Sequence, residues 1–134
     1  KKQEKPKPAK LTKPVMAGVM DVHNAQQHGD HAGAIAKLDA AKDVPRTEVD
    51  DALILAKLKL FSAQTLKDNA KLEEGLTEAV AAPSIDPAEK VTFSKFIAGL
   101  ASNRKDYEKA RQWYDFYLAA MPNDVDMTVQ AASV

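Results

Sequence analysis

The chain has 134 residues and no cysteine, and its 19 Lys and Arg balance its 19 Asp and Glu. The zero net charge gives no electrostatic support to nucleic-acid binding, and the lack of cysteine excludes disulfides, thiol catalysis and Cys-ligated zinc. Glycine is scarce and the apolar residues form no alternating runs, so the sequence favours an all-α fold. No apolar run approaches the roughly 18–20 residues of a transmembrane segment.

Residues 1–13 form a basic segment, with six Lys and two Pro against one Glu. We expect a disordered leader, because so few apolar residues cannot offset the entropy lost on ordering. It would act as a solubilising linker, or contact a membrane surface or an acidic partner. A Lys- and Pro-rich start without Met is typical of an exported mature chain. The sequence thus predicts a periplasmic or otherwise exported protein, with a cytoplasmic location as the alternative.

The rest of the chain predicts six helices in three hairpins, at about residues 14–45, 47–83 and 86–122. Each hairpin has two stretches with apolar residues at helical spacing, joined by a short polar turn. Pro14 opens the first helix, and the second hairpin starts between Thr47 and Asp50. In the third hairpin Asp86 suits a helix cap, Pro87 suits the first helical position, and Glu89 can reach back to the cap.

A shift of 38 residues superposes the chain on itself. Two columns are identical in all three hairpins: Asp30, Asp68 and Asp106, and Ala25, Ala63 and Ala101. Three further columns are apolar: Val22, Leu60 and Ala98; Leu38, Leu76 and Tyr114; and Ala41, Ala79 and Tyr117. Matched columns at one constant shift indicate an internal repeat.

The third hairpin resembles a tetratricopeptide repeat. Segment 105–111 (KDYEKAR) matches the family's turn and the start of its second helix, where Ala110 lets the two helices approach. Tyr114 stands at the family's bulky aromatic position, and Pro122 with the following Asn and Asp matches its terminating Pro-Asn. The first hairpin is similar in Gly29-Asp30-His31, Ala34-Ile35, Leu38 and Ala41.

The resemblance covers about residues 15–124 and has three departures. Leu72 replaces the small Ala in the second hairpin, and the period of 38 exceeds the family's roughly 34. A large residue early in each first helix is replaced by Gly18, Ala56 and Ser94.

The resemblance implies an α-α superhelix, a solenoid of about three helical hairpins whose first helices line a concave groove. Such a surface suits an extended or helical peptide, so we expect a non-catalytic scaffold that binds a protein or peptide. The candidate groove residues, each of which could instead belong to the core, are Met16, Val19, His23, Gln27, Ile54, Lys57, Phe61, Gln64, Thr92, Lys95, Gly99 and Asn103.

The segment from Tyr107 to Tyr117 holds five aromatic residues, too many for one buried stripe. They would pack against residues 125–134, as a capping helix or the start of a further repeat. Alternatively, Trp113, Phe116 and Tyr117 would form a partner or homo-oligomer interface, as in a structural subunit.

The sequence predicts no catalytic, cofactor or metal site. His23, His28 and His31 are close in sequence, but two of them flank a turn and the third lies more than a helical turn earlier. No nucleotide-binding loop, nucleophile elbow or zinc-protease motif is present. An enzyme or a small-ligand carrier is the remaining alternative.

Overall fold

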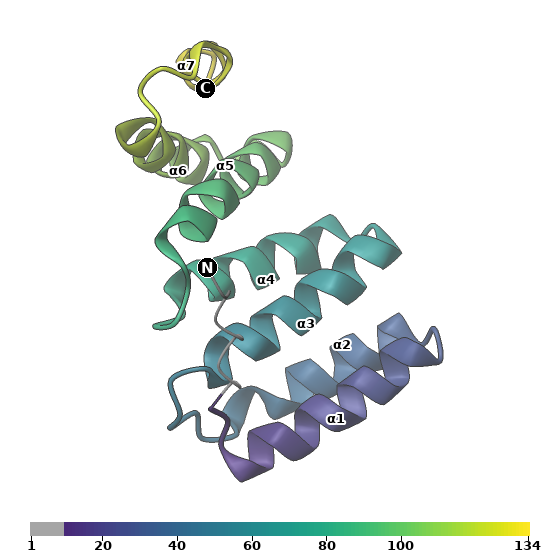
Figure 1. Cartoon of the computed structure of the whole chain (residues 1–134). Helices are drawn as coiled ribbons and strands as arrows, with labels where there is room; N and C mark the ends of the chain where they lie inside the picture. Colours follow the sequence, from purple (N-terminus) through teal and green to yellow (C-terminus); the bar gives the residue numbers. More distant parts are fainter. Residues whose placement is uncertain (1–9) are drawn as a thin grey trace, which may run out of the picture.

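A computed structural model describes residues 10–134, and the predicted all-α class is confirmed over this part of the chain (Figure 1). These residues form seven α-helices, one 3-10 turn and no strand. The helices are α1 (Lys13–Gln27), α2 (His31–Ala40), α3 (Asp51–Leu66), α4 (Asn69–Ala81), α5 (Pro87–Asn103), α6 (Tyr107–Ala120) and α7 (Val125–Ala132).

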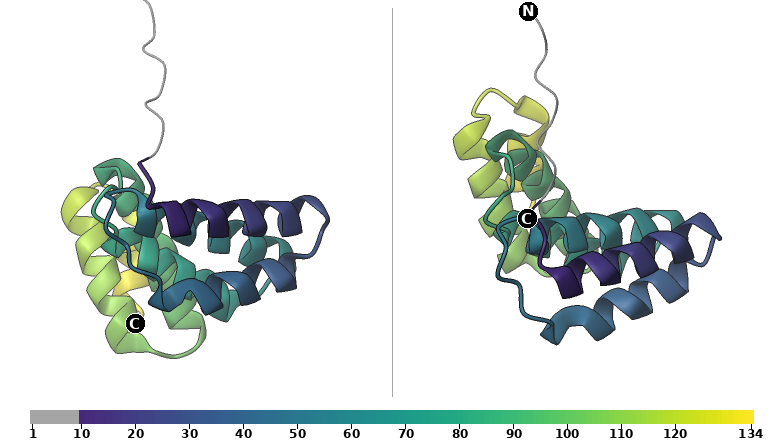
Figure 2. Two further views of the ribbon diagram at one scale, coloured as in Figure 1. Left: turned by 90° about the horizontal axis from the view of Figure 1, so that it is seen from below. Right: turned by 60° about the horizontal axis from the view of Figure 1, so that its bottom comes forward.

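Six of the helices pair in chain order into three antiparallel hairpins, which stack one on the next (Figure 1). The second helix of each hairpin packs on the first helix of the following one, α2 on α3 and α4 on α5. The axes of the first two hairpins run in nearly the same direction, whereas α6 runs across them (Figure 2). The arrangement is therefore a short helical stack of the repeat type, and α7 packs on its last hairpin.

The turn inside each hairpin has the same geometry, and this explains the identical column of Asp30, Asp68 and Asp106. The residues Gly29, Lys67 and Lys105, 38 apart, all have a positive φ, of 76°, 57° and 65°. The following Asp donates its backbone N–H to the Ala carbonyl of the first helix over 2.9–3.0 Å. Its carboxylate caps the second helix by accepting the N–H three residues on. Asp thus recurs because its carboxylate caps the second helix, whereas the Ala takes part in the turn through its backbone carbonyl.

Two of these left-handed positions hold lysine, which gives the first testable prediction. A side chain at a positive φ costs about 1 kcal/mol that glycine avoids, although glycine loses more backbone entropy on folding. We expect Lys67→Gly and Lys105→Gly each to raise the free energy of unfolding by about 0.5 kcal/mol, measured by urea denaturation. The controls Lys67→Ala and Lys105→Ala keep the β-carbon, so equal stability of each Gly and Ala pair would contradict this account.

The two helices of a hairpin approach closely where small residues meet. A β-carbon added to Gly75 of α4 would lie 3.1 Å from a methyl carbon of Leu60 and 3.5 Å from the carbonyl oxygen of Ala56, both on α3. Ala56 and Ser94, which occupy equivalent places on α3 and α5, are completely buried. The small residue Ala56 therefore serves the contact inside the second hairpin, whereas a β-carbon added to Gly18 in the first hairpin would meet no atom within 4 Å.

Ion pairs join neighbouring hairpins. Lys59 of α3 is 5% exposed, and its ammonium lies 2.9 Å from both Glu74 and Glu78 of α4 and 3.4 Å from Asp39 of α2. Glu73 of α4 accepts two hydrogen bonds from Arg104, which follows α5, and one from Lys109 of α6. Each junction of the stack is thus held by charge as well as by apolar contacts.

The start of the helical stack differs from the prediction. Residues 1–9 lie outside the described residues, but residues 10–13, predicted as part of the disordered leader, are ordered. The backbone N–H groups of Lys10 and Thr12 each donate to a carboxylate, those of Asp50 and Asp51, over 2.8 Å. Helix α1 accordingly starts at Lys13, just before the predicted Pro14.

The start of the second hairpin also differs from the prediction. Helix α3 starts at Asp51, after the predicted start near Thr47, because the Asp51 carboxylate instead accepts hydrogen bonds from Thr12 and from the N–H of Glu48. Helix α2 ends at Ala40, where a 3-10 turn from Ala41 to Asp43 continues the chain.

Candidate binding groove

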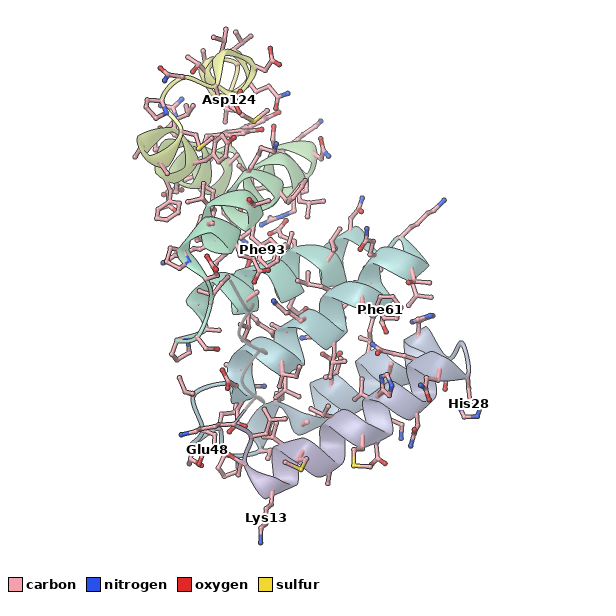
Figure 3. The ribbon with its side chains drawn as sticks, in the orientation of Figure 1. Lys13, His28, Glu48, Phe61, Phe93 and Asp124 are labelled. Carbon is pink, nitrogen blue, oxygen red and sulfur yellow. The ribbon has the colours of Figure 1, made fainter. Side chains whose placement is uncertain are left out.

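A groove of about 560 Å³ lies between the second and third hairpins. Helices α3, α4 and α5 all contribute to it, and Figure 3 shows Phe61 on α3 and Phe93 on α5. Seven of its ten lining residues are apolar: Leu60, Phe61, Leu72, Leu76, Phe93, Phe96 and Leu100. The groove therefore offers apolar surface to a ligand.

Two aromatic side chains of the groove are half exposed. The exposed fraction is 54% for Phe61 and 50% for Phe96. The Phe61 ring meets the His31 ring edge to face, with 5.4 Å between their centroids, so the first hairpin supports it. Leu76 is buried, and Leu60, Leu72, Phe93 and Leu100 are partly buried and pack in the core cluster beneath. The phenylalanines thus stand on a packed apolar base.

The polar side chains of the groove are Lys57, Gln64 and Glu89. The Lys57 ammonium lies 2.9 Å from the Glu89 carboxylate, so α3 and α5 are tied together at the groove. The sequence predicted instead that Glu89 would reach back to the cap of its own helix. In the structure α5 is capped by Asp86 alone, whose carboxylate accepts the N–H of Ala88. The two ionisable groups of the groove neutralise each other.

The structure brings three of the predicted groove residues together, Lys57, Phe61 and Gln64. The α1 residues lie elsewhere: Val19 packs against the first core cluster, while Met16, His23 and Gln27 are exposed outside the groove. Ile54 of α3 packs against the same core cluster.

The remaining predicted groove residues lie on α5, outside the groove. The Thr92 hydroxyl donates to the carbonyl of Ala88 on its own helix. The Lys95 ammonium lies 5.7 Å from the ring centre of Phe96 and 5.9 Å from that of Tyr117, so it faces α6, the second helix of its own hairpin. Gly99 lies outside the groove lining, and Asn103 lines a separate hollow beside Arg104 and Glu73.

Sequence reasoning missed most of the apolar lining. Phe93, Phe96 and Leu100 follow one another at helical spacing, which predicts a helix but not that these side chains line a groove. Leu72 and Leu76 lie on a second helix, whereas the prediction took only first helices to line the groove. Leu72 also departs from the family's small Ala. This large side chain was the one signal in the sequence that the second helix contributes to the groove.

The predicted aromatic interface is largely occupied from within the chain. Tyr117 is 6% exposed, and its hydroxyl donates to the Asp124 carboxylate over 2.7 Å; this bond raises the pKa of Tyr117 and lowers that of Asp124. Trp113 is partly buried and meets Phe116 edge to face at 5.9 Å. Phe116 is 38% exposed, with the Lys90 ammonium 5.4 Å from its ring centre. Helix α7 and the residues after it pack on this helix, with Met127, Ala131 and Val134 in one cluster with Trp113 and Tyr114.

The histidines of the first hairpin lie in separate environments. The His28 ring bonds to the carbonyl of Asn24, and the His31 ring bonds to the Ser62 hydroxyl over 3.0 Å. Among residues 10–134, no three or more His, Asp or Glu side chains are grouped so that they could hold a metal ion. No helix of the same range combines the length and apolar character needed to cross a membrane.

No family model matches the chain, and neither a curated protein nor a solved structure matches it.

Proposed function

We propose that this protein is a non-catalytic scaffold of the tetratricopeptide type, and that its groove binds an amphipathic helix of a protein partner. The observation that carries the proposal is the groove between two hairpins, with two half-exposed phenylalanines above a packed apolar base. Its volume lies within the range of about 300–1,000 Å³ typical of binding sites. Exposed aromatic residues in such a place are favoured anchors for a partner.

The chemistry of the lining favours a helical partner over an extended one. An extended peptide brings unpaired backbone N–H and C=O groups, and an apolar lining would leave them without hydrogen bonds. A helix satisfies its own backbone and presents apolar side chains at positions such as i, i+4 and i+7. With Gln64 as the one uncharged polar residue of the lining, the groove suits the apolar face of a helix.

Two observations support a scaffold of this type over an enzyme. The repeated turn, with its left-handed residue and its Asp cap at a spacing of 38, is what a stack of similar hairpins requires. The ionisable groups of the groove, Lys57 and Glu89, are paired with each other rather than aimed at a ligand. The exported location remains a prediction from the sequence.

Peptide selection tests the groove directly. A displayed library of helical peptides with large apolar residues at i, i+4 and i+7 is selected against the protein, and the affinity of the selected peptides is measured by fluorescence anisotropy. We expect Phe96→Ala to weaken binding about tenfold or more, because a half-exposed aromatic anchor is lost.

The matched control is Met16→Ala, which removes a side chain of similar exposure, 46%, on α1 outside the groove. We expect the control to leave the affinity within about twofold, since exposed residues away from an interface contribute little. Circular dichroism checks that both variants stay helical. Failure to select any helical peptide, or equal affinity for wild type and Phe96→Ala, would contradict the proposal.

A further inference from the structure

The first two hairpins meet differently from the last two. We call the contact between the first and second hairpins the first junction, and that between the second and third hairpins the second junction. In the first junction α1 packs directly on α3, whereas the equivalent helices of the second junction, α3 and α5, share no comparable packing. The groove lies at this second junction. Equivalent residues, 38 apart, therefore have different surroundings in the two junctions.

A glutamine closes the first junction. The Gln26 carboxamide of α1 donates to the Ser62 hydroxyl and to the Leu58 carbonyl of α3, over 2.9 Å in each case. The Ser62 hydroxyl also lies 3.0 Å from Nδ1 of His31, at the start of α2. Gln26 is 9% exposed and Ser62 is completely buried, so both side chains have exchanged water for these hydrogen bonds. A small hydroxyl residue of α3 thus satisfies a buried carboxamide of α1.

The same glutamine recurs in the second junction, but without this partner. Gln64 of α3 stands 38 residues after Gln26, and Leu100 of α5 stands 38 residues after Ser62. Both residues line the groove, and a leucine side chain offers no hydrogen bond. The Gln64 side chain is exposed, and within residues 10–134 the structure gives it no hydrogen bond. Gln64 therefore presents its carboxamide to whatever enters the groove.

A helix bound in the groove would cover this carboxamide. A buried amide without a hydrogen bond lowers affinity, because it has lost its contacts with water and gained none in return. The side chains nearest in the lining are apolar, with Phe61 on α3 and Phe96 and Leu100 on α5. The bonding group must therefore come from the partner.

We propose that the partner helix carries a serine or threonine within its apolar face, and that Gln64 selects the partner through this hydroxyl. The proposal rests on the function proposed for the groove and adds a chemical requirement to it. Ser62 is the model for the partner residue. Leu58, four residues before it on the same helix face, packs against the first core cluster. A partner with a large apolar residue four positions before its hydroxyl offers Gln64 the group that Ser62 offers Gln26.

Selection from a library of helical peptides tests this requirement. Large apolar residues stay fixed at i, i+4 and i+7, while i+3 and i+8, which lie on the same face, are randomised. We expect wild type to enrich serine or threonine at one of these two positions, and Gln64→Leu to enrich apolar residues there. The control Gln27→Leu makes the same change at an exposed glutamine of α1 outside the groove, and it should keep the wild-type preference.

Fluorescence anisotropy gives the size of the contact. Replacing the selected hydroxyl residue of the peptide by alanine is expected to weaken binding to wild type about tenfold, because Gln64 is then buried without its bond. The same replacement should change the affinity for Gln64→Leu by no more than about twofold. Because Gln64 is exposed in the free protein, Gln64→Leu keeps its helicity, which circular dichroism checks.

The outcomes distinguish this requirement from the function of the groove. If wild type selects helical peptides without serine or threonine at either position, or if Gln64→Leu shows the same preference as wild type, the hydroxyl requirement is overturned and peptide binding by the groove is not. If wild type selects no helical peptide, both proposals are overturned.

Discussion

Glu73→Ala is expected to lower the free energy of unfolding by about 2–3 kcal/mol, one of the two largest effects of a single substitution in this protein. Glu73 is 7% exposed and ties α4 to the third hairpin. Its carboxylate accepts hydrogen bonds of 2.8 and 2.7 Å from the Arg104 guanidinium and of 2.7 Å from the Lys109 ammonium. Because Arg104 is half exposed and regains water in the variant, the loss lies below that of a completely buried pair.

The same contact predicts a pH dependence. The hydrogen bonds from Arg104 and Lys109 lower the pKa of Glu73 from 4.5 to about 2, although burial raises it. The pKa in the folded state is thus below the unfolded value, so the contribution of Glu73 is complete above pH 4.5. It is lost as the pH falls from there toward 2. We expect wild type to lose more stability than Glu73→Gln over this range.

Urea denaturation at several pH values measures both effects, and Asp115→Ala, at an exposed place on α6, is the matched control. Because Glu73 joins the two hairpins that form the groove, Glu73→Ala should also weaken peptide binding. Equal stability of Glu73→Ala and Asp115→Ala would show that the junction does not depend on this carboxylate.

Asp51→Ala is expected to cost about 2–3 kcal/mol and to release the segment before α1. The Asp51 side chain is completely buried, and its carboxylate accepts the N–H and the hydroxyl of Thr12 and the N–H of Glu48. Burial raises the pKa of Asp51, but these hydrogen bonds outweigh it, and the pKa is lowered. The variant leaves the donors of Thr12 and Glu48 without their acceptor.

Urea denaturation gives the stability change, and hydrogen exchange shows where the chain opens: the amides of Thr12 and Glu48 should exchange faster, ahead of the rest of the chain. Asp50→Ala is the matched control, because the neighbouring carboxylate holds the N–H of Lys10 near the surface. We expect it to cost about 0.5 kcal/mol. Equal losses of stability for Asp51→Ala and Asp50→Ala would contradict the claim that the buried Asp51 carboxylate orders the segment before α1.

The groove shows which of its residues can be predicted from local sequence patterns and which cannot. Their spacing of i, i+4 and i+7 places Lys57, Phe61 and Gln64 on one face of α3, and the structure has them in the groove. The other wall comes from α5, whose apolar residues Phe93 and Phe96 were not among the predicted groove residues. Which of two apolar faces of a helix is covered depends on the angle between hairpins, and this angle is set by contacts between residues far apart in sequence.

The segment before α1 and the aromatic helix α6 also depend on contacts between residues far apart in sequence, which local patterns do not predict. Composition alone predicted disorder through Lys13, but Asp50 and Asp51, about 40 residues later, order residues 10–13. That α7 packs on the aromatic helix is seen only in the structure, where Met127 and Ala131 pack with Tyr114 and Trp113.

By itself the sequence determined the all-α class, the three hairpins and the turns, because helical periodicity, Asp caps and turn residues act within a few neighbouring positions. The tertiary structure decided which apolar residues form the groove, which carboxylates are buried, and which face of α7 stays exposed. These outcomes depend on how whole helices pack, since burial is a property of the assembled stack rather than of any one segment.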